Sequence, residues 1–287
     1  MKLPNILKNI FRQRNKLAVM QQGFVLYKNS TIHYYSFGSG SELLVAFHGY
    51  GEDGSSFKIL EIELGKKFTI IAIDFPFHGK TSWDNKLVFT KNELLQVLQI
   101  ITPLALQPFH LIGYSMGGRV ALYMLQQFSN QIKSLVLIAP DGLHHNIWHK
   151  FSTQTTLGNK LFYYTMHYPK WLFILMKVAT TVGLFNKSVY NFVQYYLKEK
   201  LSRLQLYNRW TAMRKFNPNL SVLKTIISNK HSSVKILFGK YDKIILTKNG
   251  LNFKKGNEAF VIVKEIEAGH QLLKEKHIAE ITALYNA

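Results

Sequence analysis

Residues 109–118 read FHLIGYSMGG and place one serine, Ser115, between an expected strand and an expected helix. Pro108 ends the preceding segment, and residues 109–112 form an apolar run of the length typical of a buried strand. Apolar side chains then recur at helical spacing, at Val120, Ala121, Met124, Leu125 and Phe128. The serine therefore lies at a turn from strand to helix.

The pattern Gly113-x-Ser115-x-Gly117 at such a turn is typical of a nucleophile elbow. A serine there is held in strained backbone geometry, and its neighbours must be small because strand and helix approach closely. By itself the pattern also fits a glycine-rich turn with an incidental serine. The strand before it and the helix after it favour the elbow, with the serine hydroxyl projecting clear of the sheet.

The composition of the 287-residue chain bounds the fold class. That length holds one large α/β domain, or a core domain with an inserted piece. A hydrophobic fraction of 47% with 18% charged residues predicts a full core and excludes wholesale disorder. The absence of cysteine excludes disulfides and thiolate chemistry, and fits a reducing compartment. We therefore expect a cytoplasmic protein.

The formal net charge of +20 permits attraction to anionic lipid, polyanions or acidic substrates. No nucleic-acid-binding motif accompanies it, so a lysine-rich solvated surface is favoured and no nucleic-acid partner is expected. A basic N-terminal extension, residues 1–22, is expected to form a loosely attached helix, and weak peripheral contact with an anionic membrane is its alternative reading. No transmembrane helix is expected, because Lys177 interrupts the short apolar run 171–185.

The order of apolar patterns predicts an α/β fold. Residues 24–27 and 32–35 alternate as an opening hairpin. Continuous apolar runs, which indicate parallel strands covered on both faces, follow at 43–47, 69–73, 109–112, 135–138, 234–238 and 260–263. Helical patterns lie at 56–64, 91–101, 119–128, 246–255 and 274–285. We expect a mostly parallel central sheet with helices on both faces.

One region interrupts this alternation and predicts an inserted helical cap at residues 142–219, which leaves a core domain of 23–141 and 220–287. The region has no buried-strand pattern, is dense in aromatic residues and carries a good share of the basic charge, with Glu199 its one acid. Its aromatic side chains fit two interpretations, an apolar acyl or aryl pocket or the core of the cap itself.

A serine nucleophile needs a base, and the base needs an orienting acid. His270 follows the last expected strand and is the preferred base. Asp242 follows the strand 234–238 and is the preferred acid, with Asp141 in a comparable place after the preceding strand. His110 lies within a strand and is expected to be packed. The histidines expected at the surface or in the pocket are His144, His145, His149 and His167.

Four signals in this order resemble the α/β-hydrolase superfamily across nearly the whole chain outside the N-terminal stretch and the cap. They are His48-Gly49-Tyr50, the segment 74–82 (DFPFHGKTS), the elbow at Ser115, and the loops that hold Asp242 and His270. The resemblance implies the α/β-hydrolase fold and a catalytic triad of Ser115, Asp242 and His270. One residue departs from the family pattern, because Phe77 stands where glycine is usual.

The resemblance also places an oxyanion hole at the backbone N–H groups of Tyr50 and Met116, which agrees with the need to stabilise charge on the attacked carbonyl oxygen. His48 and Asp74 are expected to shape their loops. Arg119 is either a surface residue at the start of a helix or a contact for an anionic group. The spacing indicates no metal site and no phosphate-binding loop, and no cofactor is expected.

The leading hypothesis is a serine hydrolase that cleaves a carboxylic ester or related acyl bond through an acyl-enzyme. We expect a small-molecule substrate with an apolar body and an anionic end. One alternative, from the resemblance of the elbow, is a carbon–carbon bond hydrolase or a pyruvate-eliminating lyase of the menaquinone-synthase type. A second is a non-catalytic binding protein with the hydrolase fold.

Overall fold

The computed structural model describes residues 21–84, 88–144, 147–183, 190–191, 193–194 and 197–286. The N-terminal extension therefore lies almost wholly outside the described residues. The strands of the described part are β1 (Gln21–Tyr27), β2 (Ser30–Phe37), β3 (Glu42–Phe47), β4 (Phe68–Ile73), β5 (Phe109–Tyr114), β6 (Ile132–Ile138), β7 (Ser233–Gly239) and β8 (Val261–Ile266). The helices and 3-10 turns are η1 (Gly54–Leu60), α2 (Glu61–Leu64), α3 (Lys91–Ile101), η2 (Pro103–Leu106), α4 (Met116–Gln127), α5 (Ile147–Gln154), α6 (Thr156–His167), α7 (Lys170–Thr181), α9 (Lys200–Ala212), α10 (Leu220–Lys230), α11 (Thr247–Lys254), η3 (Glu275–His277) and α12 (Ile278–Asn286).

The strands form one sheet in the order β1-β2-β4-β3-β5-β6-β7-β8. β1 and β2 are the predicted hairpin, and β2 runs antiparallel to β4. From β4 to β8 every neighbouring pair is parallel. The predicted fold class, a mostly parallel sheet in an α/β-hydrolase arrangement, is confirmed. Parallel strands end at one edge, so the loops that follow β3 to β8 converge there.

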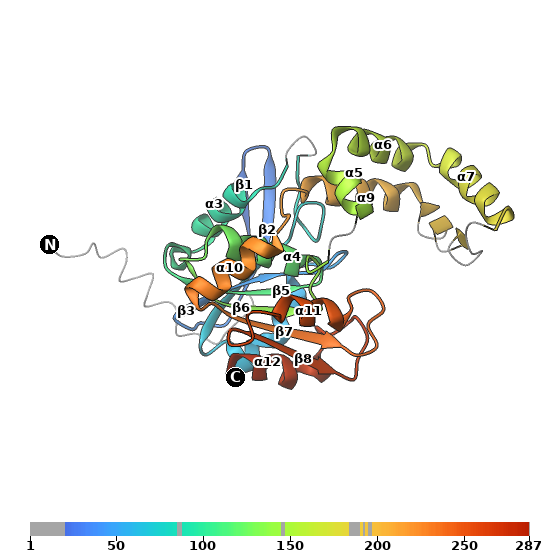
Figure 1. The fold of residues 1–287 in the computed structure, drawn as a ribbon. Helices are drawn as coiled ribbons and strands as arrows, with labels where there is room; N and C mark the ends of the chain where they lie inside the picture. The colour runs from blue at the N-terminus through green and yellow to red at the C-terminus, as the bar shows by residue number, and fades with distance from the viewer. Residues whose placement is uncertain are drawn as a thin grey trace.

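Helices cover both faces of the sheet, and the strand residues alternate between two buried clusters. Val45 and Phe47 of β3 pack with residues of α3, α4, α10 and α11, whereas Leu44 and Ala46 pack with residues of η1, α2 and α12. Figure 1 shows α12 below the sheet and α4 and α10 above it. Because the central strands are covered on both sides, they need the continuous apolar runs seen in the sequence.

β8 differs from the prediction for the run 260–263. Val261 is buried, but Lys264 and Glu265 are exposed and the residues between are only half-buried. β8 is the edge strand and pairs with β7 alone. The prediction that this run is covered on both faces is therefore wrong, because a strand at the end of a sheet borders solvent along one side.

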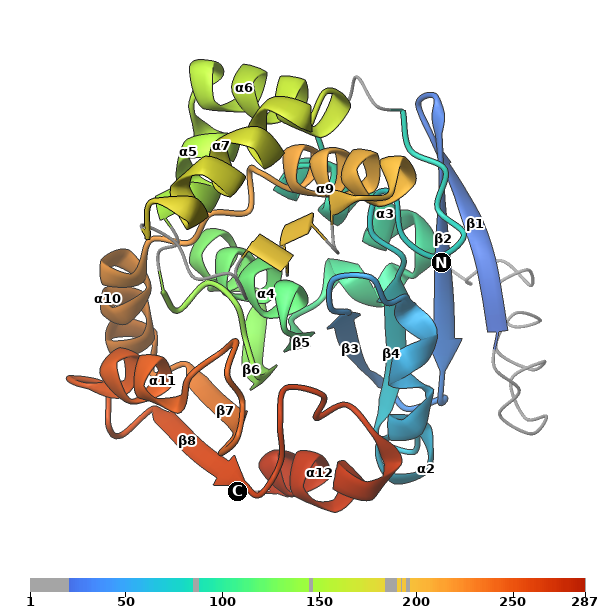
Figure 2. The ribbon, with the colours of Figure 1, turned by 90° about the vertical axis from the view of Figure 1, so that its right-hand side faces the viewer.

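α5, α6, α7 and α9 lie between β6 and β7, and no strand occurs in the described residues of 142–219. Figure 1 shows them as an arm that extends beyond the sheet, with α7 farthest along it, and Figure 2 shows the same helices from another side. We call α5, α6, α7 and α9 the insert helices. Phe162 packs against Tyr207 and Trp210, so part of the aromatic content forms a core among these helices. No helix among the described residues is long and apolar enough to cross a bilayer.

α4 meets the sheet with no room for side chains between the backbones. A Cβ on Gly117 would lie 1.9 Å from the carbonyl oxygen of Phe47, and one on Gly113 would lie 2.6 Å from the carbonyl oxygen of Gly117. Both distances are far below van der Waals contact. Glycine is therefore required at both positions by the approach of the helix to β3 and β5.

Gly117→Ala should lower the free energy of unfolding by about 3 kcal/mol, because the new methyl group must push α4 away from β3. Urea denaturation followed by circular dichroism measures this change. Gly269→Ala is the matched control, because a Cβ at Gly269 meets nothing within 4 Å. Equal stability of the two variants would contradict the close approach of α4.

Candidate active site

Ser115 sits at the junction of β5 and α4 in a backbone conformation that few non-glycine residues adopt. Its φ is 49° and its ψ is −116°. The surrounding backbone holds it there: the Ser115 N–H donates to the Ile138 carbonyl at 3.0 Å, and the Ser115 carbonyl accepts from Asp141 N–H at 2.9 Å. Such strain persists only where neighbouring structure over-determines it, and it points the side chain out of the sheet.

The hydroxyl of Ser115 lies beside His270. Its Oγ is 3.0 Å from His270 Nε2, and His270 Nδ1 is 2.7 Å from Asp242 Oδ2. The three residues come from the loops that follow β5, β7 and β8. The structure therefore brings together the serine, histidine and acid that the sequence singled out.

Asp242 is held by its own turn. It is buried, and its Oδ1 accepts hydrogen bonds from the N–H groups of Ile244 and Ile245 at 2.7 and 2.9 Å. Asp141, the alternative acid, accepts from Gly142 N–H and forms an ion pair with Arg119 instead. Of the two acids, only Asp242 contacts His270.

The two N–H groups expected to form an oxyanion hole lie near the serine. Tyr50, Ser115 and Met116 line the same pocket, and a Cβ on Gly49 would lie 3.4 Å from Cβ of Ser115. Among the described residues, neither Tyr50 N–H nor Met116 N–H has a hydrogen-bond partner. Two donors beside Ser115 are thus free to meet an acceptor on a ligand.

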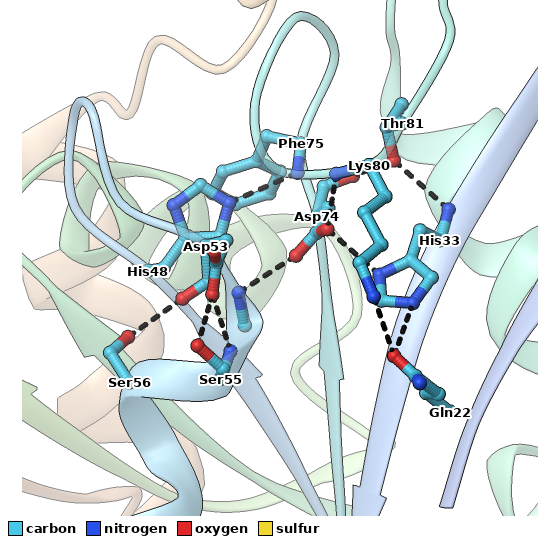
Figure 3. A network of polar contacts seen from close by, with 11 residues as sticks. Gln22, His33, His48, Asp53, Ser55, Ser56, Asp74, Phe75, Lys80 and Thr81 are labelled. Carbon is cyan, nitrogen blue, oxygen red and sulfur yellow. Dashed lines mark hydrogen bonds and ion pairs between the residues drawn. The ribbon is translucent and has the colours of Figure 1, made fainter.

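A polar network fixes the loops after β3 and β4, and Figure 3 shows Asp74 at its centre. Asp74 is fully buried and accepts from Gly54 N–H at 2.8 Å and from Lys80 N–H at 2.9 Å. His33 Nδ1 contacts its Oδ2 at 2.8 Å. The carboxylate therefore links strand β2 to the loop that follows β3 and to the loop that follows β4.

His48 joins the same two loops as a neutral ring. Its Nδ1 donates to the Gly49 carbonyl at 2.8 Å, and its Nε2 accepts from Phe75 N–H at 3.0 Å. Burial lowers the pKa of His48, which favours this neutral form with one donor and one acceptor. His48 and Asp74 thus shape their loops, as the sequence indicated.

Phe77, the departure from the family pattern, has a φ of 63° and so takes the left-handed conformation that glycine favours. Its ring packs against the main core, and its carbonyl accepts from Arg209 Nε at 2.9 Å. The Arg209 guanidinium also lies 5.1 Å from the centre of the Tyr50 ring. The turn is therefore kept despite the substitution, and Arg209 of α9 joins the insert helices to it.

A pocket of about 390 Å³ opens beside Ser115. Core loops and insert helices both line it, with apolar and basic side chains. The lining residues are Tyr50, Ser115, Met116, Arg119, Pro140, Asp141, Gly142, His144, His149, Lys150, Leu206, Trp210, Asn217, Pro218, Ile244, Ile245 and Asn249. Trp210 thus serves both the pocket and the aromatic core of the insert.

Arg119 is one of the buried residues of this wall. Its NH1 donates to His149 Nε2 at 2.7 Å, and its Nε lies 3.5 Å from Asp141 Oδ2. Burial, together with the charge of Arg119, lowers the pKa of His149 to about 4. His149 is therefore a neutral acceptor at neutral pH, and Arg119 keeps its full charge inside the pocket.

The remaining histidines are placed as follows. His144 lines the pocket, whereas His167 bonds to the Tyr163 carbonyl within α6. His110 is packed between Ser134 and Glu42 on the sheet, away from Ser115. His145 lies outside the described residues. The described residues contain no cluster of three or more histidine, aspartate or glutamate side chains that could hold a metal ion.

Two residues of the site were missed by the sequence analysis. Glu52 lies next to the Gly49 turn, and burial raises the pKa of its carboxyl group. Arg209 reaches Tyr50 from a helix more than 150 positions away in the chain. Neither belongs to a motif, and only the acidic pair Glu52-Asp53 shortly after Tyr50 could have drawn attention to Glu52.

Comparison with known proteins agrees with this geometry. Residues 42–173 match the family model described as the alpha/beta hydrolase fold. The matched stretch is a little under half of the chain, and the chain has the alpha/beta hydrolase fold. The predicted resemblance is thereby confirmed.

Three relatives illustrate the range of similarity. The hydrolase YugF of Bacillus subtilis (strain 168) is 28% identical over 46% of this chain and 48% of its own length. Monoacylglycerol lipase abhd6-B of Xenopus laevis is 30% identical over 41% of this chain and 36% of its own length. An esterase structure from Thermogutta terrifontis with malate bound has a TM-score of 0.61 and 16% identity, covering 94% of this chain and 97% of that one. The sequence match spans about half or less of these curated relatives, and the structural likeness shows the fold.

His78 allows a test of the buried histidines. Burial, with His48 and Arg209 adding to it, lowers its pKa to about 2. Below pH 6.5 the unfolded chain takes up a proton that folded His78 does not, so folding stability is lost as the pH falls. His78→Asn, which keeps a donor for the Pro76 carbonyl, should therefore lose about 2 kcal/mol less stability than the wild type between pH 7 and pH 5.

Urea denaturation at the two pH values measures this difference. His231→Asn, at an exposed histidine, is the control and should follow the wild type. A pH dependence of His78→Asn that also matches the wild type would show that His78 is not held neutral.

Proposed function

We propose that the chain is a serine hydrolase that cleaves a carboxylic ester or a related acyl bond through an acyl-enzyme. The observation that carries this proposal is the chain of two hydrogen bonds from Ser115 through His270 to Asp242 at the wall of the pocket. The esterase and lipase names among the relatives support the same class of reaction.

In the first half-reaction, Ser115 Oγ attacks the carbonyl carbon while His270 Nε2 takes its proton. Asp242 accepts from His270 Nδ1 and stabilises the imidazolium that forms. The N–H groups of Tyr50 and Met116 receive the oxyanion, and each such donor lowers the barrier by about 3 kcal/mol. The imidazolium then protonates the departing alcohol.

In the second half-reaction, water replaces the alcohol. His270 takes a proton from the water as it attacks the acyl carbon, and the same two N–H groups stabilise the second oxyanion. Collapse of the tetrahedral intermediate returns the proton to Ser115 Oγ and releases the acid. Ser115, His270 and Asp242 thus end in the state in which they began.

The pocket wall supports a substrate with an apolar body and an anionic end. Leu206, Trp210 and Ile245 supply apolar surface, and Arg119 with Lys150 supplies positive charge. In this proposal the insert helices act as a cap over the core domain, because Leu206 and Trp210 of α9 contribute to the apolar wall while the core supplies the nucleophile.

Ser115→Ala should reduce turnover of a p-nitrophenyl ester by about 10⁴-fold or more, because the nucleophile is lost. His270→Ala should match it, and Asp242→Asn should fall by a similar factor because the ring loses its orienting carboxylate. Asp141→Asn is the matched control and should keep catalysis of a neutral ester within a few-fold of the wild type.

A fluorophosphonate should label wild-type Ser115, and mass spectrometry of the modified peptide locates the adduct. Full ester turnover by Ser115→Ala would end the proposal. A label at Ser115 without ester turnover would favour the carbon–carbon bond hydrolase or lyase, for which the buried cation Arg119 beside Ser115 is the supporting feature.

Arg119 and Lys150 can be tested by substrate choice. For matched esters that differ only in a terminal carboxylate, Arg119→Gln should lower kcat/KM for the anionic ester about tenfold to a hundredfold. The neutral ester should change little. Lys150 is exposed, so Lys150→Gln should leave folding intact. It should lower the ratio of kcat/KM for the anionic ester to kcat/KM for the neutral ester by less than Arg119→Gln does. An unchanged ratio in both variants would exclude an anionic end.

A further inference from the structure

α7 exposes an apolar face to solvent. Ile174, Leu175, Val178 and Val182 are 64%, 56%, 55% and 63% exposed, and their spacing places them along one side of the helix. Met176 and Ala179 are buried on the other side. The helix therefore has one apolar face that is packed and a second apolar face that is not.

The preceding helix repeats this feature. Leu157, Leu161 and Tyr164 of α6 and Tyr168 at its C-terminal end recur at intervals of four, three and four residues, and all are exposed. Leu157 is 72% exposed and Tyr168 62%. Two consecutive helices at the outer part of the arm in Figure 1 thus present large apolar side chains. Single exposed apolar residues are ordinary on protein surfaces, but a continuous series marks an interaction site.

The charges around this face are all positive. Residues 147–183 contain no aspartate or glutamate, and Lys160, Lys170 and Lys177 are exposed. On a helical projection of α7, Lys170 and Lys177 lie together on one flank of the exposed apolar stripe. The whole region 142–219 holds eleven basic residues against the single acid Glu199, which is about half of the net charge of the chain.

These features select one class of partner. A second copy of the chain would bring two faces of the same positive charge together. An anionic bilayer offers phosphate oxygens to the lysines and a hydrocarbon boundary to the apolar stripe. Tyrosine at the edge of the face suits the interface, because its ring is apolar and its hydroxyl is polar.

We propose that α7 and the adjoining end of α6 form a membrane-docking surface for an anionic bilayer. α7 lies in the plane of the headgroups, with Ile174 and Val178 directed into the acyl boundary and Lys170 and Lys177 paired with lipid phosphates. This surface belongs to the described residues and is separate from the basic stretch at residues 1–20.

The test is sedimentation of the full-length protein with vesicles of phosphatidylcholine alone and of phosphatidylcholine mixed with phosphatidylglycerol. Wild-type protein should bind the anionic vesicles. The double variant Ile174→Ser/Val178→Ser should lose about tenfold or more of its partition coefficient. The matched control is Ile62→Ser/Leu106→Ser, at core-domain positions 84% and 70% exposed, and should bind as the wild type does.

The charge is tested separately. Lys170→Gln/Lys177→Gln should lower the partition coefficient about twenty-five-fold at low salt, since each lysine near an anionic surface contributes about fivefold. Lys66→Gln/Lys255→Gln removes the same charge from exposed positions of the core domain and should bind much more tightly than the α7 lysine variant. Circular dichroism and turnover of a soluble ester should be unchanged in the α7 variants.

Equal vesicle binding by Ile174→Ser/Val178→Ser and wild-type protein would overturn the proposal. This is also the result expected if residues 1–20 carry all of the binding. Binding that does not distinguish neutral from anionic vesicles would also overturn it. So would size-exclusion chromatography that showed a wild-type dimer converted to a monomer by the α7 variant. Ser115→Ala should bind vesicles normally, so a failed hydrolase proposal leaves this test intact.

Discussion

The contact of α4 with the carboxyl ends of β3 and β5 is the constraint on which the rest of the site depends. Because the Gly117 backbone lies directly on the Phe47 carbonyl, the chain must turn within one residue, and Ser115 is forced to a positive φ. The same contact sets Met116 at the first position of α4, where its N–H has no intrahelical partner, and brings the Gly49 turn beside Ser115. A looser helix would separate the serine from both free N–H groups. The polar network centred on Asp74 then holds the Tyr50 side of this arrangement in place.

Much of the fold could be predicted because it depends on local sequence patterns. Strands buried on both faces need continuous apolar runs, and glycines at a close backbone approach cannot be replaced, so both leave a clear mark. The positions of Asp242 and His270 followed from one rule, that loops after parallel strands meet at one edge. The same rule could not separate Asp242 from Asp141, since both follow a strand. The difference lies in side-chain direction: Asp242 faces His270, and Asp141 faces Arg119.

What escaped prediction depends on contacts between distant segments. Nothing in the run 260–263 says that its strand ends the sheet, and its exposure follows from that place alone. Phe77 keeps a left-handed turn because core packing of its ring and the bond from Arg209 offset a strain of about 1 kcal/mol. Arg209 itself has no motif. Its role in joining α9 to the Tyr50 loop arises from a cation–π contact that only the folded chain creates. Part of the pocket wall also escaped prediction, because His149, Lys150, Leu206 and Trp210 come from helices with no recognisable sequence motif.

The basic side chains at the pocket and on the insert helices form two physically different populations. Arg119 of α4 is buried at the pocket, where a charge is screened little by salt and one anionic group of a ligand gains a strong, directional partner. Lys170 and Lys177 are exposed, and attraction to a charged surface there falls off within about 8 Å at physiological ionic strength. Salt therefore weakens the attraction of Lys170 and Lys177 to an anionic surface, while the interaction of Arg119 with an anionic group of a ligand is nearly unaffected. In the two proposals, Arg119 of the core domain holds the anionic end of a substrate inside the pocket, whereas the α7 lysines meet an anionic surface outside it. Neither interaction sets the strength of the other.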